Sequence, residues 1–144
     1  MNGYQIVCES LSSTTRFFHG SPIQNLKILD LKKDSVRFKT QSPNVFLTDD
    51  VSYASCFTFA WSNDEGFELG SVNNSPWQLQ VPKKYKDRLK KPCSIYTVEN
   101  GSYKQIKSAP MEYVSKHPVK ILKEEKYKTA LEAMMKNGVK VVYT

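Results

Sequence analysis

Short apolar runs separated by turn residues constrain the fold of this chain more than any other feature. The runs are three to six residues long, several alternate apolar with polar positions, and Gly, Pro, Asn or Asp stand between them. Runs this short, with a period of two, are typical of strands. The expected strands cover residues 4–8, 16–19, 45–47, 67–72, 77–81, 93–98, 102–106, 111–115, 119–122 and 139–143. The chain is therefore predicted to consist mainly of strands.

Two segments have helical periodicity instead. Ala54, Phe57 and Trp61 recur at helical spacing after the N-cap candidates at 48–50, which predicts a helix over residues 51–61. A second helix is predicted over 124–137, with Gly138 positioned to end it. Residues 23–42 are too irregular for either pattern and are predicted to form a loop with about one helical turn.

The connections indicate the fold class. Asn100-Gly101 is a strong hairpin signal and predicts that strands 93–98 and 102–106 pair with each other. Strands joined partly by hairpins, with two helices, favour an α+β fold with a mixed or antiparallel sheet against which the helices pack. The 144 residues contain no internal repeat and no low-complexity linker, so a single domain over residues 1–144 is expected.

Composition narrows the function classes. No apolar stretch approaches the roughly 20 residues that span a bilayer, and no secretory leader is evident, so a cytoplasmic protein without a membrane partner is expected. The three cysteines are widely spaced without a Cys-x-x-Cys pair, and no metal site is predicted. The pattern says nothing of oligomeric state.

A basic run adds a second interpretation. Lys+Arg outnumber Asp+Glu by 21 to 14, and six basic residues fall within nine positions. They are Lys83, Lys84, Lys86, Arg88, Lys90 and Lys91. A basic run that contains Tyr85 is suited to a nucleic-acid backbone, although such a run is more often simply a solvated surface.

Three separated segments carry the chemistry. Residues 17–22 have the sequence Phe-Phe-His-Gly-Ser-Pro, residues 45–57 contain Phe46, Tyr53 and Phe57, and residues 111–114 have the sequence Met-Glu-Tyr-Val. Phe46 and Phe57 stand eleven positions apart. In this order the segments resemble the NAD-binding core of the diphtheria-toxin and poly(ADP-ribose) polymerase branch of ADP-ribosyltransferases, the His-Tyr-Glu type. The resemblance spans residues 17–122.

The resemblance implies a split-sheet ADP-ribosyltransferase-like fold, with NAD as co-substrate, and it assigns a role to each motif residue. His19 would hold a ribose hydroxyl, and the backbone of Gly20 would pair with the nicotinamide amide, because glycine allows close approach. Ser21 would add a hydroxyl contact. Phe46 and Phe57 would sandwich the nicotinamide ring, with Tyr53 nearby. Glu112 would stabilise the cation that develops on the ribose as the glycosidic bond breaks.

Two departures from the family pattern matter. Phe46 stands where the triad has a tyrosine, so one hydroxyl is missing, and Tyr53 is the candidate to replace it. Pro110 stands where arginine-modifying members of the other branch have Glu or Gln, so arginine is not the expected acceptor.

Three hypotheses follow. The first is a mono-ADP-ribosyltransferase that moves ADP-ribose from NAD to an unidentified macromolecular acceptor, protein or nucleic acid, with NAD hydrolysis as a side activity. The second is a catalytically silent module of the same fold that binds NAD, ADP-ribose or nucleic acid. The third is a basic nucleic-acid-binding α+β domain in which the His-Gly-Ser match is fortuitous.

Overall fold

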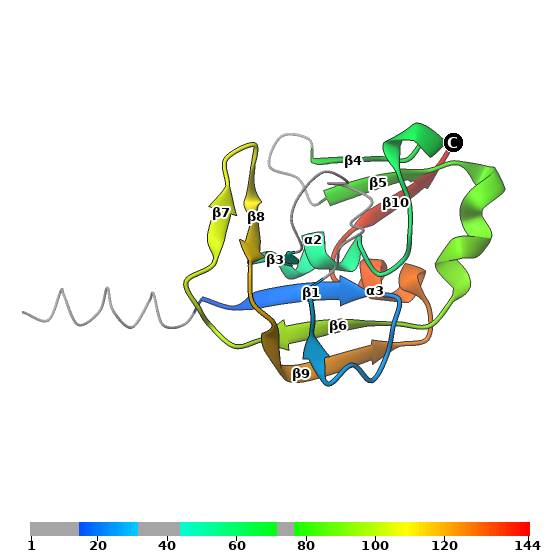
Figure 1. The fold of residues 1–144 in the computed structure, drawn as a ribbon. Helices are drawn as coiled ribbons and strands as arrows, with labels where there is room; N and C mark the ends of the chain where they lie inside the picture. The colour runs from blue at the N-terminus through cyan, green and yellow to red at the C-terminus, as the bar shows by residue number, and fades with distance from the viewer. Residues whose placement is uncertain (1–14, 32–43, 72–76) are drawn as a thin grey trace, which may run out of the picture.

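The computed structural model describes residues 15–31, 44–71 and 77–144. Its strands form two separate sheets (Figure 1). The predicted strand at 4–8, and residues 32–42 of the predicted loop, lie outside the described residues.

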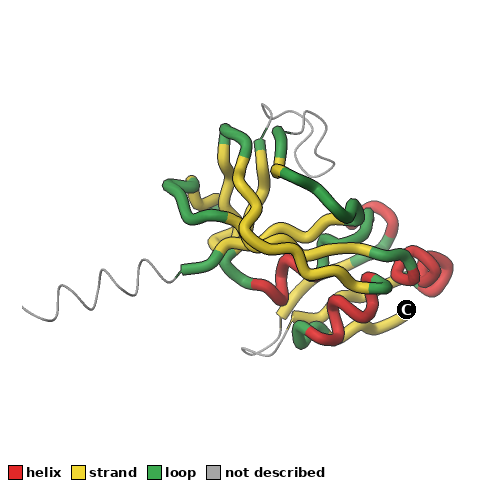
Figure 2. The backbone as a smooth tube through the Cα atoms, turned by 90° about the horizontal axis from the view of Figure 1, so that it is seen from below, coloured by secondary structure: helices red, strands yellow, loops and turns green. Residues whose placement is uncertain are grey.

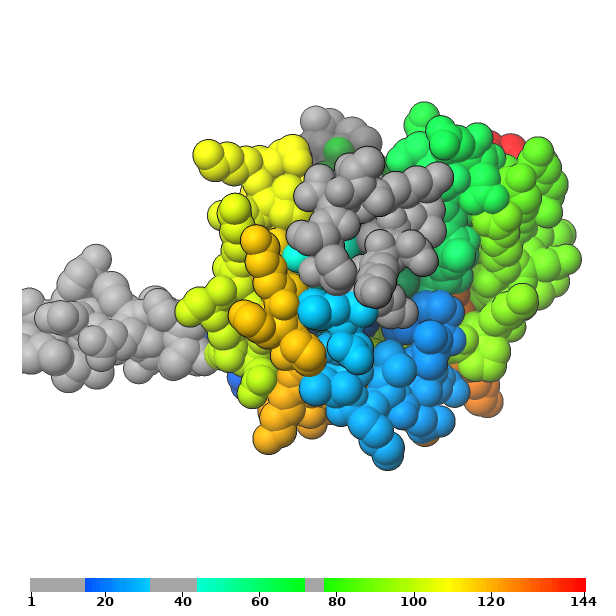
Figure 3. Space-filling view, viewed as in Figure 1, coloured from blue at the N-terminus to red at the C-terminus, as the bar shows by residue number. Residues whose placement is uncertain are grey.

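The larger sheet has seven strands in the order β2-β9-β6-β1-β3-β8-β7, and every neighbouring pair is antiparallel. Its members are β1 (Phe17–Ser21), β2 (Ile28–Leu29), β3 (Val45–Thr48), β6 (Cys93–Val98), β7 (Lys104–Ile106), β8 (Ala109–Ser115) and β9 (Val119–Tyr127). The short strand β2 lies in a segment for which the sequence predicts a loop, and it pairs with β9 through Ile28 and Leu29. Figure 3 shows blue atoms of the segment that contains β2 beside orange atoms of the part of the chain that contains β9.

The smaller sheet has the order β10-β5-β4. It contains β4 (Glu68–Ser71), β5 (Trp77–Val81) and β10 (Lys140–Tyr143). β4 is antiparallel to β5 and β10 is parallel to it, so this sheet is mixed. A sheet-rich chain with few helices and mainly antiparallel pairing agrees with the predicted α+β class.

The helical segments are short. They are α2 (Val51–Ser55), α3 (Ala130–Lys136), and the 3₁₀ helices η1 (Asn63–Glu65) and η2 (Lys83–Lys90). α3 packs against both α2 and η2, and it also contacts β10 of the smaller sheet and β6 of the larger sheet. Figure 2 shows these short helical segments, in red, among the strands. No helix of the described residues has the length and apolar character needed to cross a bilayer.

Helix α2 begins as predicted but ends early, so the prediction of a helix over 51–61 is wrong for its second half. Asp50 is the N-cap and accepts from the amides of Ser52 and Tyr53. Beyond Ser55 the side chains compete with the helix for backbone carbonyls, since the Thr58 hydroxyl donates to the carbonyl of Ser55 at 2.8 Å. Such local bonds favour turns over a continued helix.

The prediction of a helix over 124–137 is wrong for its first part. Residues up to Tyr127 continue β9, because residues 93–96 of β6 pair with residues 124–127. Helix α3 starts only after Thr129, whose hydroxyl accepts from the amide of Glu132 at 3.0 Å. Gly138 follows the helix with φ of +80°, which is the predicted ending.

The predicted hairpin at Asn100-Gly101 does not form. β7 pairs with β8, not with β6, because both edges of β6 are already occupied by β1 and β9. The Tyr103 ring instead packs on Phe17 with ring centroids 5.0 Å apart, which directs the chain toward β8.

Strand β6 separates two hydrophobic clusters. Cys93 and Ile95 belong to the cluster formed with α2, α3, η2 and β5, whereas Tyr96 and Val98 belong to the cluster formed with β1, β3 and β9. Successive side chains point to opposite faces of a strand, so a strand with a core on each side is buried along its length. The larger sheet is therefore fixed from both faces, and it provides a rigid base for the site.

Candidate functional site

A pocket of about 150 Å³ lies where β1, β3, β8 and α2 meet. Six residues singled out in the sequence line it, and we call it the Glu112 pocket. They are His19, Gly20, Phe46, Tyr53, Phe57 and Glu112. The structure therefore brings together side chains from three segments of the chain, while the roles predicted for them stay predictions.

Strand register places Glu112 at this point. Thr48, the last residue of β3, is directly opposite Glu112 in β8. Asp50 follows two residues later and starts α2 by capping its first amides. Tyr53 therefore lies on the first turn of a helix that begins beside the carboxylate, so a short strand, a cap and one helical turn are enough to form this side of the pocket.

A buried hydrogen bond joins the two polar groups of the pocket. The Tyr53 hydroxyl donates to Oε1 of Glu112 at 2.8 Å. Glu112 is 3% exposed and Tyr53 is 6% exposed. A hydrogen bond to a charged group in a water-poor environment is stronger than the same bond in water. Tyr53 thus brings a hydroxyl to the carboxylate. The family pattern expects this hydroxyl from a tyrosine at position 46, where this chain has phenylalanine.

His19 is held by the strand next to its own. Its Nδ1 lies 2.7 Å from the carbonyl oxygen of Phe46. Because a carbonyl oxygen can only accept, the proton of this bond is on Nδ1, and in the neutral ring the lone pair is on Nε2. The tautomer and the ring orientation are both set by β3.

Gly20 is required by packing inside the protein. A Cβ at this position would lie 2.1 Å from the carbonyl oxygen of Ala54 in α2. The sequence suggested that glycine serves here to let a ligand approach the backbone. The structure gives an internal reason, because only glycine allows α2 to lie this close to β1.

Aromatic rings form much of the pocket wall. Phe46 comes from β3, while Tyr53 and Phe57 come from α2 and the turn after it, with ring centroids 4.9 Å apart and planes tilted by 57°. An apolar cavity of about 150 Å³ in another protein holds one benzene ring. The pocket is therefore of the right size and lining for a single six-membered ring.

Ser21 does not line this pocket. It is 2% exposed, and its hydroxyl oxygen accepts from the amide of Ile23 at 3.0 Å. The hydroxyl closes the turn after β1, and the contact that we expected between Ser21 and a nicotinamide amide is not supported by this position.

Cys56, which directly follows α2, is fully buried. Burial raises the pKa of the Cys56 thiol to about 12, so the thiol stays protonated at neutral pH. Within residues 15–31, 44–71 and 77–144, no group of three or more His, Cys, Asp or Glu side chains is placed to hold a metal ion. Among the residues that line the Glu112 pocket, Glu112 is the one with a carboxyl group.

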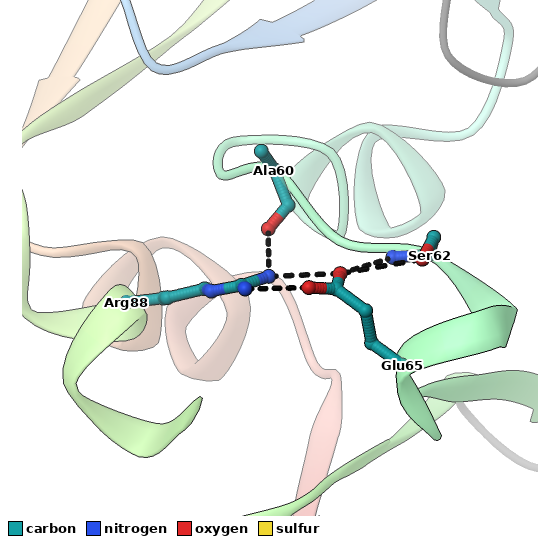
Figure 4. A network of polar contacts seen from close by, with 4 residues as sticks. All are labelled: Ala60, Ser62, Glu65 and Arg88. Atoms are coloured by element: carbon teal, nitrogen blue, oxygen red, sulfur yellow. Dashed lines mark hydrogen bonds and ion pairs between the residues drawn. The ribbon is translucent and has the colours of Figure 1, made fainter. Parts of the chain in front are cut away.

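The basic run forms η2 and points in several directions. Arg88 turns inward, and its guanidinium forms a two-pronged ion pair with Glu65 at 2.9 and 2.5 Å while also donating to the Ala60 carbonyl (Figure 4). Lys83, Lys86 and Lys90 line a separate hollow that Leu131 of α3 and Tyr143 of β10 also line. None of the basic residues of η2 lines the Glu112 pocket.

Four further residues line the Glu112 pocket and were not singled out from the sequence. They are Phe18, Leu47, Thr48 and Ala54. Each lies beside a motif residue in the chain, so their proximity to the motif was the only signal that could have found them. Their side chains are apolar or small, and they shape the pocket without adding a charge.

Comparison with protein-family models, with curated proteins and with solved structures gives no match for this chain.

Proposed function

We propose that the protein is an NAD-dependent mono-ADP-ribosyltransferase whose Glu112 pocket receives the nicotinamide ring. The observation that carries the proposal is a buried carboxylate hydrogen-bonded to a tyrosine in the wall of an aromatic pocket of single-ring size. The two-sheet arrangement supports the split-sheet core that the family resemblance implies.

The chemistry of the pocket suits cleavage of a nicotinamide–ribose bond. Phe46, Tyr53 and Phe57 offer ring faces and edges to a flat leaving group. As the bond between ribose C1′ and the nicotinamide nitrogen breaks, positive charge develops on the ribose. The Glu112 carboxylate is the counter-charge to this cation in the proposal, and Tyr53 keeps it in place. The ADP-ribose then passes to a macromolecular acceptor, or to water when no acceptor is bound.

His19 and Gly20 take supporting roles in the proposal. His19, with its tautomer set by the Phe46 carbonyl, holds a ribose hydroxyl. Gly20 brings α2 close to β1 and thereby places Tyr53 and Phe57 around the ring. NAD is the co-substrate, and no step of the proposal needs a metal ion.

The test is release of nicotinamide from NAD by the purified full-length chain. Glu112→Gln keeps the shape of the side chain and removes its charge, so we expect release to fall by about 10²–10³-fold. His19→Ala should also reduce release. Glu68→Gln, in the exposed part of β4, is the matched control and should leave release unchanged.

Equal release by the wild type and Glu112→Gln would refute the role of the carboxylate. Absence of release with or without cell extract, while NAD still binds, would favour the second hypothesis, a silent module. Phe46 in place of tyrosine is the feature that motivates this alternative.

A further inference from the structure

A second pocket of about 260 Å³ adjoins the Glu112 pocket, and Tyr53 and Phe57 line both. Trp61 and Trp77 stand in its wall, so we call it the tryptophan pocket. The start of β8, including Met111 directly before Glu112, forms another part of the wall. The tryptophan pocket is thus formed by elements that also form the Glu112 pocket.

The two indole rings are held in fixed orientations. Trp61 donates from Nε1 to the Cys56 carbonyl at 2.7 Å and stacks on Phe57, with ring centroids 5.6 Å apart and planes at 21°. Trp77 donates from Nε1 to Oδ2 of Asp50 at 2.7 Å. Because both indole N–H groups are bonded within the protein, the rings are already oriented when a ligand arrives, which lowers the entropic cost of binding.

The lining indicates a flat, partly polar ligand. Four aromatic side chains surround the pocket, and aromatic walls of this kind bind planar rings by stacking or edge contacts. Asn63 and Ser108 add polar groups to the same wall. A heteroaromatic ring with hydrogen-bonding groups at its edge, such as a nucleobase, matches both features, whereas an aliphatic side chain matches neither.

Positive charge lies close to the pocket. Exposed Lys107 directly precedes Ser108. The whole chain carries a formal charge of +7, which attracts polyanions.

We propose that the tryptophan pocket binds an unpaired base of a single-stranded nucleic acid, with a neighbouring phosphate close to Lys107. In a duplex the bases are stacked on one another, so only a single strand can offer a base to the pocket. This binding does not depend on the proposed cleavage of NAD.

The composition of the chain makes the test direct. Trp61 and Trp77 are the only two tryptophans of the 144 residues, so all tryptophan fluorescence comes from this pocket. The full-length protein is titrated with a short oligothymidylate and a short oligouridylate, with a duplex of equal length, and with NAD alone. We expect both single strands to quench the fluorescence, with an affinity that falls as salt rises, and the duplex to quench far less.

Matched variants test the stacking. Trp61→Ala should weaken binding of the single strand by about 5- to 150-fold, the usual effect of losing one stacking partner. Trp61→Phe keeps a ring and should retain most of the affinity, and Trp77 is then the only tryptophan. If Trp61→Ala does not fold, as judged by circular dichroism, the quenching of Trp77 in Trp61→Phe still tests the proposal.

Several outcomes would overturn the proposal. Equal quenching by duplex and single strand would indicate binding to phosphates alone. Quenching by NAD that competes with the oligonucleotide would assign the pocket to the dinucleotide, and quenching by an aromatic peptide but not by the oligonucleotide would indicate a protein partner. Glu112→Gln keeps both tryptophans, so oligonucleotide binding by this variant separates failure of this proposal from failure of the proposed NAD cleavage.

Discussion

The Glu112 pocket and helix η2 hold their charged side chains in opposite ways. In the pocket, Glu112 is nearly inaccessible and is bonded to Tyr53, which is 59 positions away in the chain. In η2, basic residues that are adjacent in the chain are mostly exposed, and they separate onto different faces, as Arg88 and Lys86 show. Strand register can therefore bring side chains that are distant in the chain to one site. A run of charged residues that are adjacent in the chain does not bring their side chains together.

The largest expected effect is on the packing that forms the pocket. In Gly20→Ala the new methyl group would overlap the carbonyl oxygen of Ala54, which stands 2.1 Å from its position. Overpacking against backbone costs about 3 kcal/mol when the neighbour cannot move freely. We expect urea denaturation to show this loss, or to show that the variant does not fold.

Gly70→Ala is the control, because a Cβ at Gly70 of β4 meets nothing within 4 Å. Its free energy of unfolding should stay within about 1 kcal/mol of the wild type. Equal stability of the two variants would mean that α2 can move away from β1, and the pocket would then be less rigid than the structure indicates.

A smaller effect is expected from the hydroxyl that contacts the carboxylate. Tyr53→Phe keeps the ring in both pockets and removes the donor to Glu112. Nicotinamide release should fall about 10-fold, the effect of one hydrogen bond to a charged group. Tyr113→Phe is the control, because its hydroxyl contacts Asp49 at 3.3 Å on the exposed surface. Equal rates for Tyr53→Phe and the wild type would remove Tyr53 from the proposed mechanism.

The smallest effect concerns η2, where stability should depend on pH. The hydrogen bond from Arg88 holds the pKa of Glu65 below its ordinary value of 4.5. A carboxyl whose pKa is lower in the folded state stabilises the fold above the unfolded pKa, and this contribution disappears as the pH falls through the folded pKa. Glu65→Gln should therefore be less stable than the wild type at pH 7, with the difference shrinking below about pH 4.5.

Urea unfolding at a series of pH values measures this difference. Asp87→Asn in η2, the helix that carries Arg88, is the matched control. Asp87 pairs with Lys90 in a highly exposed ion pair, and such pairs contribute little. If Glu65→Gln and Asp87→Asn behaved alike, the two-pronged ion pair of Arg88 would be no more than another surface contact.

Local sequence patterns predict the strands better than their partners. Alternation and turn residues correctly place strands at 77–81 and 93–98, because both signals lie within a few residues. Asn100-Gly101 fails as a hairpin signal because the neighbours of β6 come from residues 17–21 and 119–127. Glu124 to Tyr127 fails as a helix start for the same reason, since a distant strand offered a better set of hydrogen bonds.

In the candidate site, too, local patterns identify some residues and miss those that only distant contacts bring together. His19, Phe46 and Glu112 could be singled out from motif order and spacing, and the structure places all three in one pocket. Trp61 and Trp77 could not be linked in this way, because they meet only when the β4–β5 pair lies beside the end of α2. No motif within either segment carries that information.

The strand order also determines how the chain reaches its folded state. β1 pairs along its whole length with β6, so Phe17 must find Val98 and Ser21 must find Ser94 before this ladder exists. Contacts between such distant residues require long loops to close, and they make folding slow compared with a chain of local hairpins. A partly folded chain that still lacks β8 has β1 and β3 in place but no Glu112 beside Tyr53. The polar pair of the pocket therefore forms only when β8 joins the sheet.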